Sequence, residues 1–341
     1  MLPGMALRSH ALTALSFSIL TFVAQSCGGD TAATASPPGG DGGPTGADGG
    51  TTPAPDGGGS LPDGSSPEGA VTTGPCAGKT GAPGSRTVTL MSGGQSRAFD
   101  LHVPAKYDPA KRTPLVFLFH GFTMTPSQIA TASHFADVAD ARGMIVAFPS
   151  GTSNSFNAGN CCGAAASSNV DDVGFTRDMI ASLDAQYCVD AKRVFSTGFS
   201  NGGYMSYRLA CELSDKVAAI APVSGILALD PCTPKRPVPV LHIHGTSDPL
   251  VPFSTVSASI DAFKAKNTCA AGAGMVVYEK GDVSCTKWGP CAANADVELC
   301  TVTGGGHQWP GGDTLPYGGT PTMNLIASTA IADFFDAHPM P

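Results

Sequence analysis

One short stretch near the middle of the chain constrains the fold more than any other part of the sequence. An apolar run at residues 194–197 leads into a Gly-x-Ser-x-Gly motif at residues 198–202, and a helix-like segment follows. A glycine on each side of Ser200 lets a strand and a helix approach closely and lets the serine adopt a strained conformation on a tight turn. Such a turn exposes a serine hydroxyl, so Ser200 is a candidate nucleophile. In a chain with 43 glycines the pattern also arises by chance, and its context has to decide.

Composition bounds the kind of protein that this chain forms. With 341 residues, of which 42% are hydrophobic and 13% charged, the chain can bury one sizeable core. A change in composition near residue 75 indicates one domain behind a long leader. The net charge is −8 and Lys and Arg do not cluster. Nucleic-acid binding requires grouped basic residues that neutralise phosphates, so we expect no nucleic-acid partner.

The N-terminal residues have the features of an export signal. Arg8 lies in a short leading region, residues 11–23 are apolar, and small residues surround Cys27. The apolar run is shorter than the ~20 residues that a membrane-spanning helix needs. Residues 24–27 resemble a bacterial lipoprotein signal, in which the cysteine is lipidated. We therefore expect residues 1–27 to be a signal peptide and the protein to be extracellular or anchored to the outer membrane through Cys27.

Residues 28–75 consist mainly of Gly, Pro, Asp, Ser and Thr. Because this segment cannot bury enough apolar surface to offset the entropy lost on ordering, we expect a disordered linker. It would act as a spacer between a membrane anchor and a folded domain, and a low-complexity tail without function is the alternative. Residues 76–341 are then expected to form a single domain.

The cysteines also indicate export. The chain contains 11, an odd number, and ten remain once Cys27 is set aside. An even number in an exported chain predicts up to five disulfides, although the pairing does not follow from the sequence. Metal binding is the weaker interpretation, because Cys-x-x-Cys does not recur and an oxidising compartment disfavours free thiolates. The ten are Cys76, Cys161, Cys162, Cys188, Cys211, Cys232, Cys269, Cys285, Cys291 and Cys300.

Beyond residue 76 the hydrophobic pattern alternates between strands and helices. Residues 86–91 and 97–103 alternate apolar and polar side chains around a Ser-Gly-Gly turn, which predicts an antiparallel hairpin. Five continuous apolar runs suit strands buried on both faces of a parallel sheet, at residues 114–119, 144–148, 194–197, 217–223 and 238–243. Helices are predicted over residues 128–141, 172–187, 201–213, 257–266 and 322–337. This order predicts an α/β fold with a mostly parallel central sheet, an N-terminal antiparallel hairpin and helices on both faces.

Three candidate catalytic side chains lie where such a sheet collects ligands, beyond the carboxyl ends of its strands. Ser200 and Asp248 follow predicted strands, and His307 lies in a glycine-rich loop. The chain order Ser, Asp, His is that of the α/β-hydrolase triad. In that arrangement His307 takes the proton of Ser200, while Asp248 fixes the imidazole tautomer and stabilises its protonated form.

Each assignment has a structural alternative. Ser200 could be an ordinary strand-to-helix turn residue, Asp248 a turn residue before proline, and His307 a loop histidine. His242 and His244 are expected to be core histidines with local hydrogen bonds. A metal site from these two histidines and Asp248 is a further alternative, but it lacks the acidic partners of a hydrolytic metal centre. We therefore expect no metal and no organic cofactor.

An acyl-transfer site also needs donors for the oxyanion of its tetrahedral intermediate. Two backbone N–H groups are candidates. One is that of Phe122, which follows the pair His120 and Gly121, and the other is that of Asn201, at the start of the helix after Ser200. The side chain of His120 itself is expected to make local hydrogen bonds at the end of its strand.

Five spaced motifs carry a resemblance to a known family. They lie at residues 157–163, 170–175, 198–205, 242–248 and 305–311. In these motifs the chain resembles the polyhydroxybutyrate depolymerase and feruloyl esterase group of carbohydrate-esterase-like α/β hydrolases. The resemblance covers residues 76–341 and implies a secreted serine esterase with an α/β-hydrolase catalytic domain. It also implies that Ser200, Asp248 and His307 form the triad and that Phe122 follows the oxyanion His-Gly pair.

Two further features concern the surroundings of the site. Trp309 is a candidate for lining the acyl or alcohol subsite, because its flat side chain offers a large contact area, and a core or rim tryptophan is the alternative. Asp171 and Asp172 look catalytic, but capping of the helix predicted from residue 172 explains them.

These observations predict a secreted serine carboxylesterase that forms an acyl-Ser200 intermediate. The substrate would be an extracellular ester, either a feruloyl or acetyl group on polysaccharide or a polyester oligomer of hydroxyalkanoate, and a pocket rather than a long groove would favour the former. A secreted serine peptidase is the first alternative, because the fold does not fix the bond that is cleaved. The second alternative is a non-catalytic, polysaccharide-binding surface lipoprotein, although a binding protein does not require a complete set of nucleophile, acid and base.

Overall fold

The computed structural model describes residues 76–341, so the signal peptide and linker predicted over residues 1–75 lie outside the described residues. The strands are β1 (Gly84–Ser92), β2 (Gln95–Val103), β3 (Thr113–Phe119), β4 (Ile145–Pro149), β5 (Val189–Phe199), β6 (Ile220–Val223), β7 (Val240–Gly245), β8 (Met275–Lys280), β9 (Val283–Trp288) and β10 (Val297–Val302). The α-helices are α1 (Pro126–Ser133), α2 (Phe135–Arg142), α3 (Gly163–Ser167), α4 (Asp172–Gln186), α5 (Asn201–Glu212), α6 (Val256–Lys266) and α7 (Ala327–Ala337). Two 3-10 helices are η1 (Phe253–Thr255) and η2 (Ala292–Asn294).

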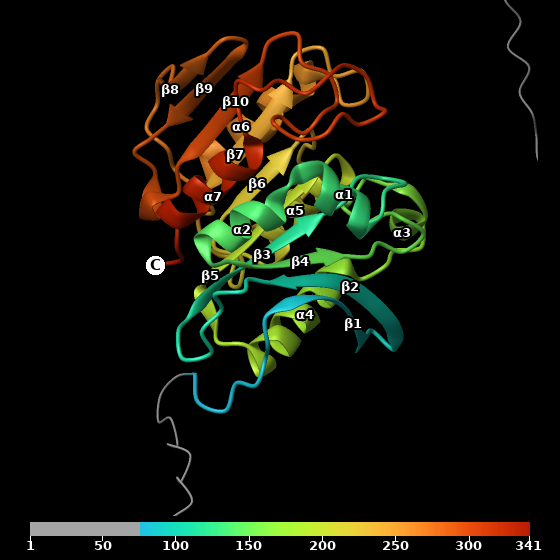
Figure 1. Ribbon diagram of the computed structural model, residues 1–341. Helices are drawn as coiled ribbons and strands as arrows, with labels where there is room; N and C mark the ends of the chain where they lie inside the picture. The colour runs from blue at the N-terminus through green and yellow to red at the C-terminus, as the bar shows by residue number, and fades with distance from the viewer. Residues whose placement is uncertain (1–75) are drawn as a thin grey trace, which may run out of the picture. The chain divides into compact units, whose positions relative to one another are not determined.

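The strands form one sheet in the order β1-β2-β4-β3-β5-β6-β7-β10-β9-β8 (Figure 1). The central strands β4, β3, β5, β6, β7 and β10 run parallel to one another. At one edge β2 of the β1–β2 hairpin pairs antiparallel with β4, and at the other edge β9 pairs antiparallel with β10 and β8 pairs antiparallel with β9. This topology confirms the predicted α/β fold with its N-terminal hairpin.

Helices cover both faces of the sheet (Figure 1). Helices α4, α5 and α6 pack on one face, and α1, α2 and α7 pack on the other. Side chains of β3 alternate between the two layers: Leu115 and Phe117 contribute to the first core cluster, and Val116 and Leu118 to the second. All four are fully buried, and burial of one such side chain stabilises the fold by about 1.5–3 kcal/mol. The continuous apolar runs therefore place these strands in the middle layer.

Two helix predictions were wrong in their bounds. The helix expected over residues 128–141 is split into α1 and α2 at His134, which has a left-handed conformation with φ 52° and whose imidazole contacts Asp313 at 2.8 Å. The helix expected from residue 322 begins only at Ala327. The preceding backbone pairs with a neighbouring loop instead, since the carbonyl of Thr322 accepts a hydrogen bond from the N–H of Gly311.

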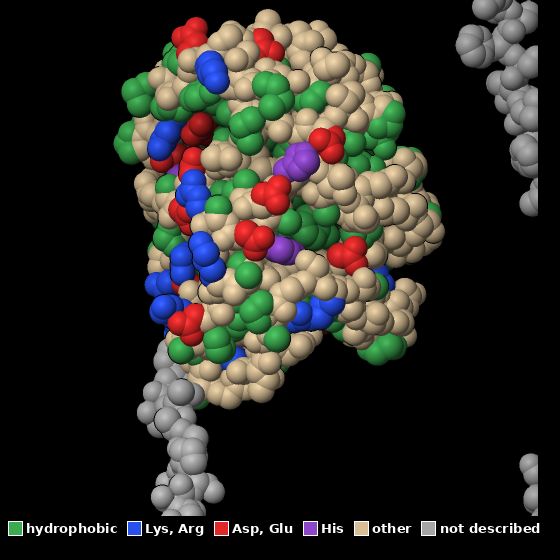
Figure 2. Space-filling view, viewed as in Figure 1, with side chains coloured by type: hydrophobic (Ala, Val, Ile, Leu, Met, Phe, Trp, Pro, Cys, Tyr) green, Lys and Arg blue, Asp and Glu red, His purple; other side chains and the backbone are tan. Residues whose placement is uncertain are grey.

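Strands β8, β9 and β10 were not predicted from the sequence. Cys285 of β9 and Cys300 of β10 lie opposite one another and form a disulfide. Strand β8 is an edge strand whose hydrophobic side chains are exposed, among them Met275 and Val276, and Figure 2 shows such side chains on the surface in this region. Strand β10 leads into the loop that carries His307.

The prediction of five disulfides is confirmed. The ten cysteines of residues 76–341 pair as Cys76–Cys188, Cys161–Cys162, Cys211–Cys232, Cys269–Cys291 and Cys285–Cys300. Stable disulfides belong to oxidising compartments such as the periplasm or the outside of the cell.

On the face seen in Figure 2, Lys and Arg side chains are interspersed with Asp and Glu. Within residues 76–341, none of the helices combines the length and the apolar character that crossing a bilayer requires.

The two adjacent aspartates at the start of α4 have separate roles. Asp171 is the N-cap, and its Oδ1 accepts a hydrogen bond from the N–H of Gly174 at 2.7 Å. The fully buried carboxylate of Asp172 accepts hydrogen bonds from Arg97 Nη2 and from the N–H of Asn157, both at 2.7 Å. Capping therefore explains Asp171, while Asp172 fastens the hairpin and the loop at Asn157 to α4.

Replacing Asp172 with alanine is expected to lower the free energy of unfolding by about 3–5 kcal/mol, because it leaves the guanidinium of Arg97 buried without a counter-charge. Urea unfolding followed by circular dichroism measures this change. Asp178→Ala, on the same helix but partly exposed, is the control and should alter stability by at most about 0.5 kcal/mol. Equal losses for the two variants would contradict the interpretation.

Candidate active site

Ser200 occupies a sharp turn between β5 and α5. Its backbone has φ 52° and ψ −120°, which is rare for a residue other than glycine. A Cβ added at Gly198 would lie 2.5 Å from the backbone of Gly202, and one added at Gly202 would collide with the carbonyl of Phe119. The flanking glycines thus permit the close strand–helix approach that the motif predicts, and the turn holds Ser200 in a strained conformation.

His307 and Asp248 form a buried pair beside this turn. The Nδ1 of His307 lies 2.6 Å from Asp248 Oδ2, and the two residues are 1% and 6% exposed. The other carboxylate oxygen, Oδ1, accepts hydrogen bonds from the N–H groups of Leu250 and Val251 at 2.9 and 2.8 Å. With Nδ1–H donating to the carboxylate, His307 has its basic lone pair on Nε2.

Electrostatics keep the Asp248 carboxyl ionised. Burial raises its pKa, but hydrogen bonds from His244 and His307, together with the charge of His307, outweigh that effect and hold the pKa of Asp248 below its usual range. An ionised carboxylate in this position can orient an imidazole and stabilise its protonated form.

Ser200 and His307 line one cavity of about 320 Å³. No direct hydrogen bond joins the two side chains among those of residues 76–341, an open arrangement that is common in ligand-free sites. Burial and the charge of Asp248 raise the pKa of Tyr204, so its hydroxyl stays protonated at the cavity wall. The lining residues are Gly121, Phe122, Thr123, Cys161, Cys162, Phe199, Ser200, Tyr204, Leu250, Val251, His307 and Tyr317.

The turn after β3 brings Phe122 to the same cavity. A Cβ added at Gly121 would lie 3.4 Å from the Cβ of Ser200, so this backbone runs directly past the serine. The turn is held by His120, whose Nδ1 donates to the carbonyl of Gly121 at 2.8 Å and whose Nε2 accepts from the N–H of Gly151 at 3.1 Å. Burial lowers the pKa of His120 to about 4, which matches this neutral, locally bonded form.

The backbone N–H groups of Phe122 and Asn201 were the predicted oxyanion donors. Among the turn, loop and cap hydrogen bonds of the described part of the chain, neither N–H is a donor. That of Asn201 also lies in the first turn of α5, where a helix leaves its N–H groups unpaired. Both groups belong to backbone segments next to Ser200.

The side chain of Asn201 has a separate structural role. Its Oδ1 accepts from the N–H of Phe156 at 2.7 Å, and its Nδ2 donates to the carbonyl of Phe156 at 3.0 Å and contacts Cys161 Sγ at 3.7 Å. The residue next to Ser200 thus fixes the loop that carries the adjacent, disulfide-bonded Cys161 and Cys162, which form part of the cavity wall.

Trp309 lies in the core instead of the cavity. Its side chain is fully buried in the cluster beneath α1, α2 and α7, and its Nε1 donates to Ser328 Oγ at 3.1 Å. Because a side chain without exposed surface cannot reach a ligand, this corrects the prediction that Trp309 lines a substrate subsite.

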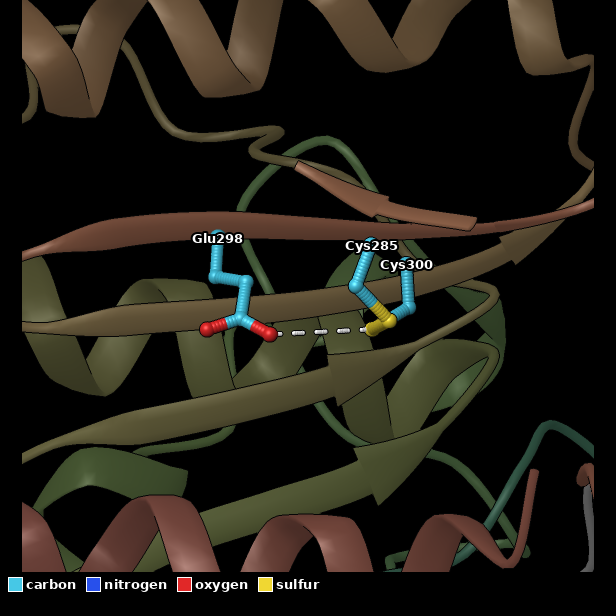
Figure 3. A group of neighbouring side chains, drawn as sticks. All are labelled: Cys285, Glu298 and Cys300. Atoms are coloured by element: carbon cyan, nitrogen blue, oxygen red, sulfur yellow. Dashed lines mark hydrogen bonds between the residues drawn. A yellow bond between two sulfur atoms is a disulfide. The ribbon is translucent and has the colours of Figure 1, made fainter. Parts of the chain in front are cut away.

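The predicted metal alternative does not match the hydrogen bonds. His242 and His244 are core histidines, as expected, and their ring nitrogens bond to each other, to Tyr207 and to the carbonyl of Val251. Elsewhere in residues 76–341, Cys285, Glu298 and Cys300 form a group with metal-ligand spacing (Figure 3). The two sulfurs are joined in a disulfide and so provide no thiolate for a metal.

Comparisons with known proteins agree with this fold. The sequence profile of the Phospholipase/Carboxylesterase family, Abhydrolase_2, matches residues 174–285. The chain is 32% identical to feruloyl esterase B of Piromyces equi over 225 residues. This match covers 60% of this chain and 41% of that protein. It is 30% identical over 235 residues to feruloyl esterase D of Neurospora crassa, covering 65% of this chain and 78% of that protein. The solved acetyl xylan esterase from Aspergillus awamori superposes with a TM-score of 0.56 at 15% identity, covering 74% of this chain and 99% of that one.

The sheet topology and the turn at Ser200 define an α/β hydrolase. More narrowly, the chain belongs to the family of carboxylic ester hydrolases that includes feruloyl esterase D. It spans only about two fifths of the length of feruloyl esterase B.

Several cavity residues were missed by reasoning from the sequence. Leu250 and Tyr317 carry no motif of their own and reach the cavity only through the folding of separate loops, while Tyr204 lies within the motif at residues 198–205, on α5, but was not assigned to the site. The adjacent pair Cys161 and Cys162 did offer a signal, because it lies in the motif at residues 157–163 that carries the family resemblance, but neither cysteine was assigned to the site.

Proposed function

We propose that this chain is an exported serine carboxylesterase in which Ser200, His307 and Asp248 act as nucleophile, general base and orienting acid. The observation that carries the proposal is the buried 2.6 Å pair of His307 and Asp248 beside the cavity that holds Ser200 on its strained turn. The N–H groups of Phe122 and Asn201 are proposed to bind the oxyanion.

The reaction runs in two stages. Nε2 of His307 accepts the proton of Ser200 as Oγ attacks the ester carbonyl, and the oxygen of the tetrahedral intermediate accepts hydrogen bonds from the two backbone N–H groups. The C–O bond to the alcohol breaks as His307 returns the proton to the leaving oxygen. Water then attacks the acyl-Ser200 ester by the same route and releases the acid. Asp248 stays ionised throughout and stabilises the imidazolium.

The shape of the cavity bears on the substrate. Its volume of about 320 Å³ is at the lower end of the range for small-molecule pockets, and aromatic and disulfide groups form much of its wall. These features favour an aromatic or acetyl ester on polysaccharide over a long polyester chain. Feruloyl esterase B and feruloyl esterase D, whose names state feruloyl esters, support the same choice. A hydroxyalkanoate oligomer, the substrate of a polyhydroxybutyrate depolymerase, is the second candidate.

A substrate panel tests this choice. We expect methyl ferulate or acetylated xylan to give a kcat/KM at least about tenfold above that of hydroxybutyrate oligomers, and peptide substrates to give none above background. Higher kcat/KM on hydroxybutyrate oligomers would favour the polyester reading, and cleavage of peptides in preference to esters would favour the serine peptidase. Failure to react with a fluorophosphonate, together with measurable glycan binding, would favour a non-catalytic surface protein.

Phe122 offers a sharper test of the aryl subsite. Its ring is 45% exposed, lines the cavity and packs so closely on Gly163 that a Cβ there would lie 2.5 Å from the ring. Phe122→Ala should raise KM for methyl ferulate about three- to tenfold through lost aromatic contact, and should change KM for p-nitrophenyl acetate less. Tyr278→Ala removes an exposed aromatic side chain outside the cavity and should change neither. An equal rise for both esters would contradict an aryl subsite at Phe122.

Export and anchoring concern residues outside the described part of the chain. We propose that residues 1–27 direct export, that Cys27 carries a lipid and that residues 28–75 connect it to the catalytic domain at residues 76–341. The five disulfides support an oxidising location. Mass spectrometry of the mature N-terminus tests the anchor: a diacylglycerol-modified Cys27 is expected, and an unmodified residue at the mature N-terminus would contradict lipidation.

A further inference from the structure

A row of buried polar side chains leads from the interior of the domain to the carboxylate of Asp248. We propose that Tyr207, His242 and His244 form a hydrogen-bonded chain that positions Asp248 and, through it, His307. The inference rests on the proposed role of Asp248, and it assigns positioning residues beyond the three catalytic side chains.

The contacts are continuous. Tyr207 Oη lies 2.8 Å from His242 Nδ1, and His242 Nε2 lies 3.0 Å from His244 Nδ1. His244 Nε2 lies 2.8 Å from the carbonyl of Val251 and 3.4 Å from Asp248 Oδ2. That carboxylate oxygen is the one that accepts the hydrogen bond from His307. Tyr207, His242 and His244 are at most 1% exposed, so water does not compete for these bonds.

For a neutral His244, the last acceptor fixes the direction of every bond in the chain. A carbonyl oxygen only accepts, so His244 Nε2 carries the proton that it donates to Val251. In neutral His244 the other nitrogen, Nδ1, is then an acceptor, and His242 Nε2–H must donate to it. His242 Nδ1 in turn accepts from the hydroxyl of Tyr207. Burial lowers the pKa of His242 and raises that of Tyr207, so both stay neutral, as this arrangement requires.

All of these bonds therefore point toward Asp248. Each donor polarises the next, and the chain ends with the positive end of an N–H dipole between Asp248 Oδ2 and the carbonyl of Val251. Val251 also donates its own N–H to Asp248 Oδ1. His244 thus holds both the carboxylate and the loop that carries it against β7, which fixes the plane in which Asp248 Oδ2 accepts the hydrogen bond from His307.

The chain also links the acid to the nucleophile. Tyr207 lies on α5, about two turns after Ser200, which caps the start of the same helix. His242 and His244 lie on β7 two residues apart, so their side chains are on the same face of the strand. The element that carries Ser200 and the element that precedes Asp248 are therefore joined by hydrogen bonds as well as by apolar packing. A displacement of about 1 Å within such a site can lower the rate about a hundredfold.

The test measures how fast a fluorophosphonate labels Ser200, together with kcat and KM for p-nitrophenyl acetate. We expect His244→Phe to slow labelling and kcat by about ten- to a hundredfold with KM nearly unchanged. His244→Gln should retain most of the rate, because its amide nitrogen can place an N–H where Nε2 of the imidazole lies. Tyr207→Phe, which removes one oxygen atom, should reduce kcat to a smaller extent and carries the test if His244→Phe does not fold.

A matched control separates positioning from general damage to the core. His338 is also buried and bonded to a backbone carbonyl, that of Phe334, but it lies at the end of α7 away from the chain. His338→Phe should lower thermal stability and leave the labelling rate unchanged. Folded His244→Phe that labels at the wild-type rate, or equal slowing by His244→Phe and His244→Gln, would overturn the inference. A wild-type protein that is not labelled at all would overturn the proposed function itself and, with it, this inference.

Discussion

Replacement of Ser200 by alanine is expected to lower kcat for p-nitrophenyl acetate by about 10⁵- to 10⁶-fold and to leave the fold intact. The loss follows because Oγ is the only protein atom of the proposed mechanism that bonds to the acyl group. The fold should persist because the turn is held by its backbone: the N–H of Ser200 donates to the carbonyl of Val223 at 2.9 Å, and its carbonyl accepts from Tyr204 at 3.0 Å. Steady-state kinetics and thermal unfolding measure the two effects separately.

Ser257→Ala provides the matched control for this experiment. Ser257 is an exposed serine on α6, so its replacement removes the same atom without touching the cavity. Its kcat should equal that of the wild type. Turnover by Ser200→Ala within about tenfold of the wild type, with unchanged thermal unfolding, would rule out Ser200 as the nucleophile.

The second large effect is expected from Asp248→Asn, which should lower kcat by about 10⁴-fold. An amide NH₂ in place of Oδ2 would donate to His307 Nδ1 and so place the imidazole proton on Nε2, the nitrogen that must accept the proton of Ser200. The same NH₂ group would also face the Nε2–H of His244, so that two hydrogen-bond donors would oppose each other. KM should change little, because the carboxylate does not line the cavity.

The ionisation of Asp248 and a matched control complete this test. The pKa of Asp248 is held below its usual range, so in the wild type this carboxylate stays ionised across the acid limb of activity. Asp261→Asn, an exposed substitution on α6, is the control and should keep wild-type kcat. A loss of less than about tenfold in Asp248→Asn would contradict the role of the carboxylate in selecting the tautomer.

The parts of the site that could be predicted are those that local chemistry determines. Two glycines around a serine predict a tight turn into which few other residues fit. The structure gives the reason, because a Cβ at Gly198 or Gly202 would collide with neighbouring backbone. Parallel strands also bring their carboxyl ends to one edge of the sheet, so the residues after β5 and β7 could be expected to meet there.

The strands that were missed depend on distant partners. β8 has exposed side chains throughout and β9 is only partly buried, so neither presents the apolar period of a core strand. Neighbours in space set the pairing of β8 with β9 and of β9 with β10. The Cys285–Cys300 disulfide joins β9 to β10, and this cysteine pairing could not be predicted from the sequence. The glycine-rich loop was enough to select His307 as a candidate, although β10, the strand that precedes this loop, was not predicted.

Side-chain environments were the least predictable part. Trp309 sits two residues after His307, yet the loop turns its indole into the core, where Ser328 satisfies the N–H. His242 and His244 were expected to be core histidines, and the alternation of strand side chains does put them on one face. Their connection to Asp248 on one side and to Tyr207 on the other requires α5 and β7 to be packed together, which no local pattern encodes.

The central claim is that one serine, Ser200, is the activated nucleophile of an esterase. Fluorophosphonate labelling of the native protein, followed by peptide mass spectrometry, tests it most directly, since the reagent reacts with activated serines and needs no knowledge of the natural substrate. The account predicts a single adduct on the peptide that contains Ser200, loss of ester hydrolysis in proportion to labelling, and no adduct in the Ser200→Ala variant. An unlabelled wild-type protein, or an adduct on a different residue, would contradict it.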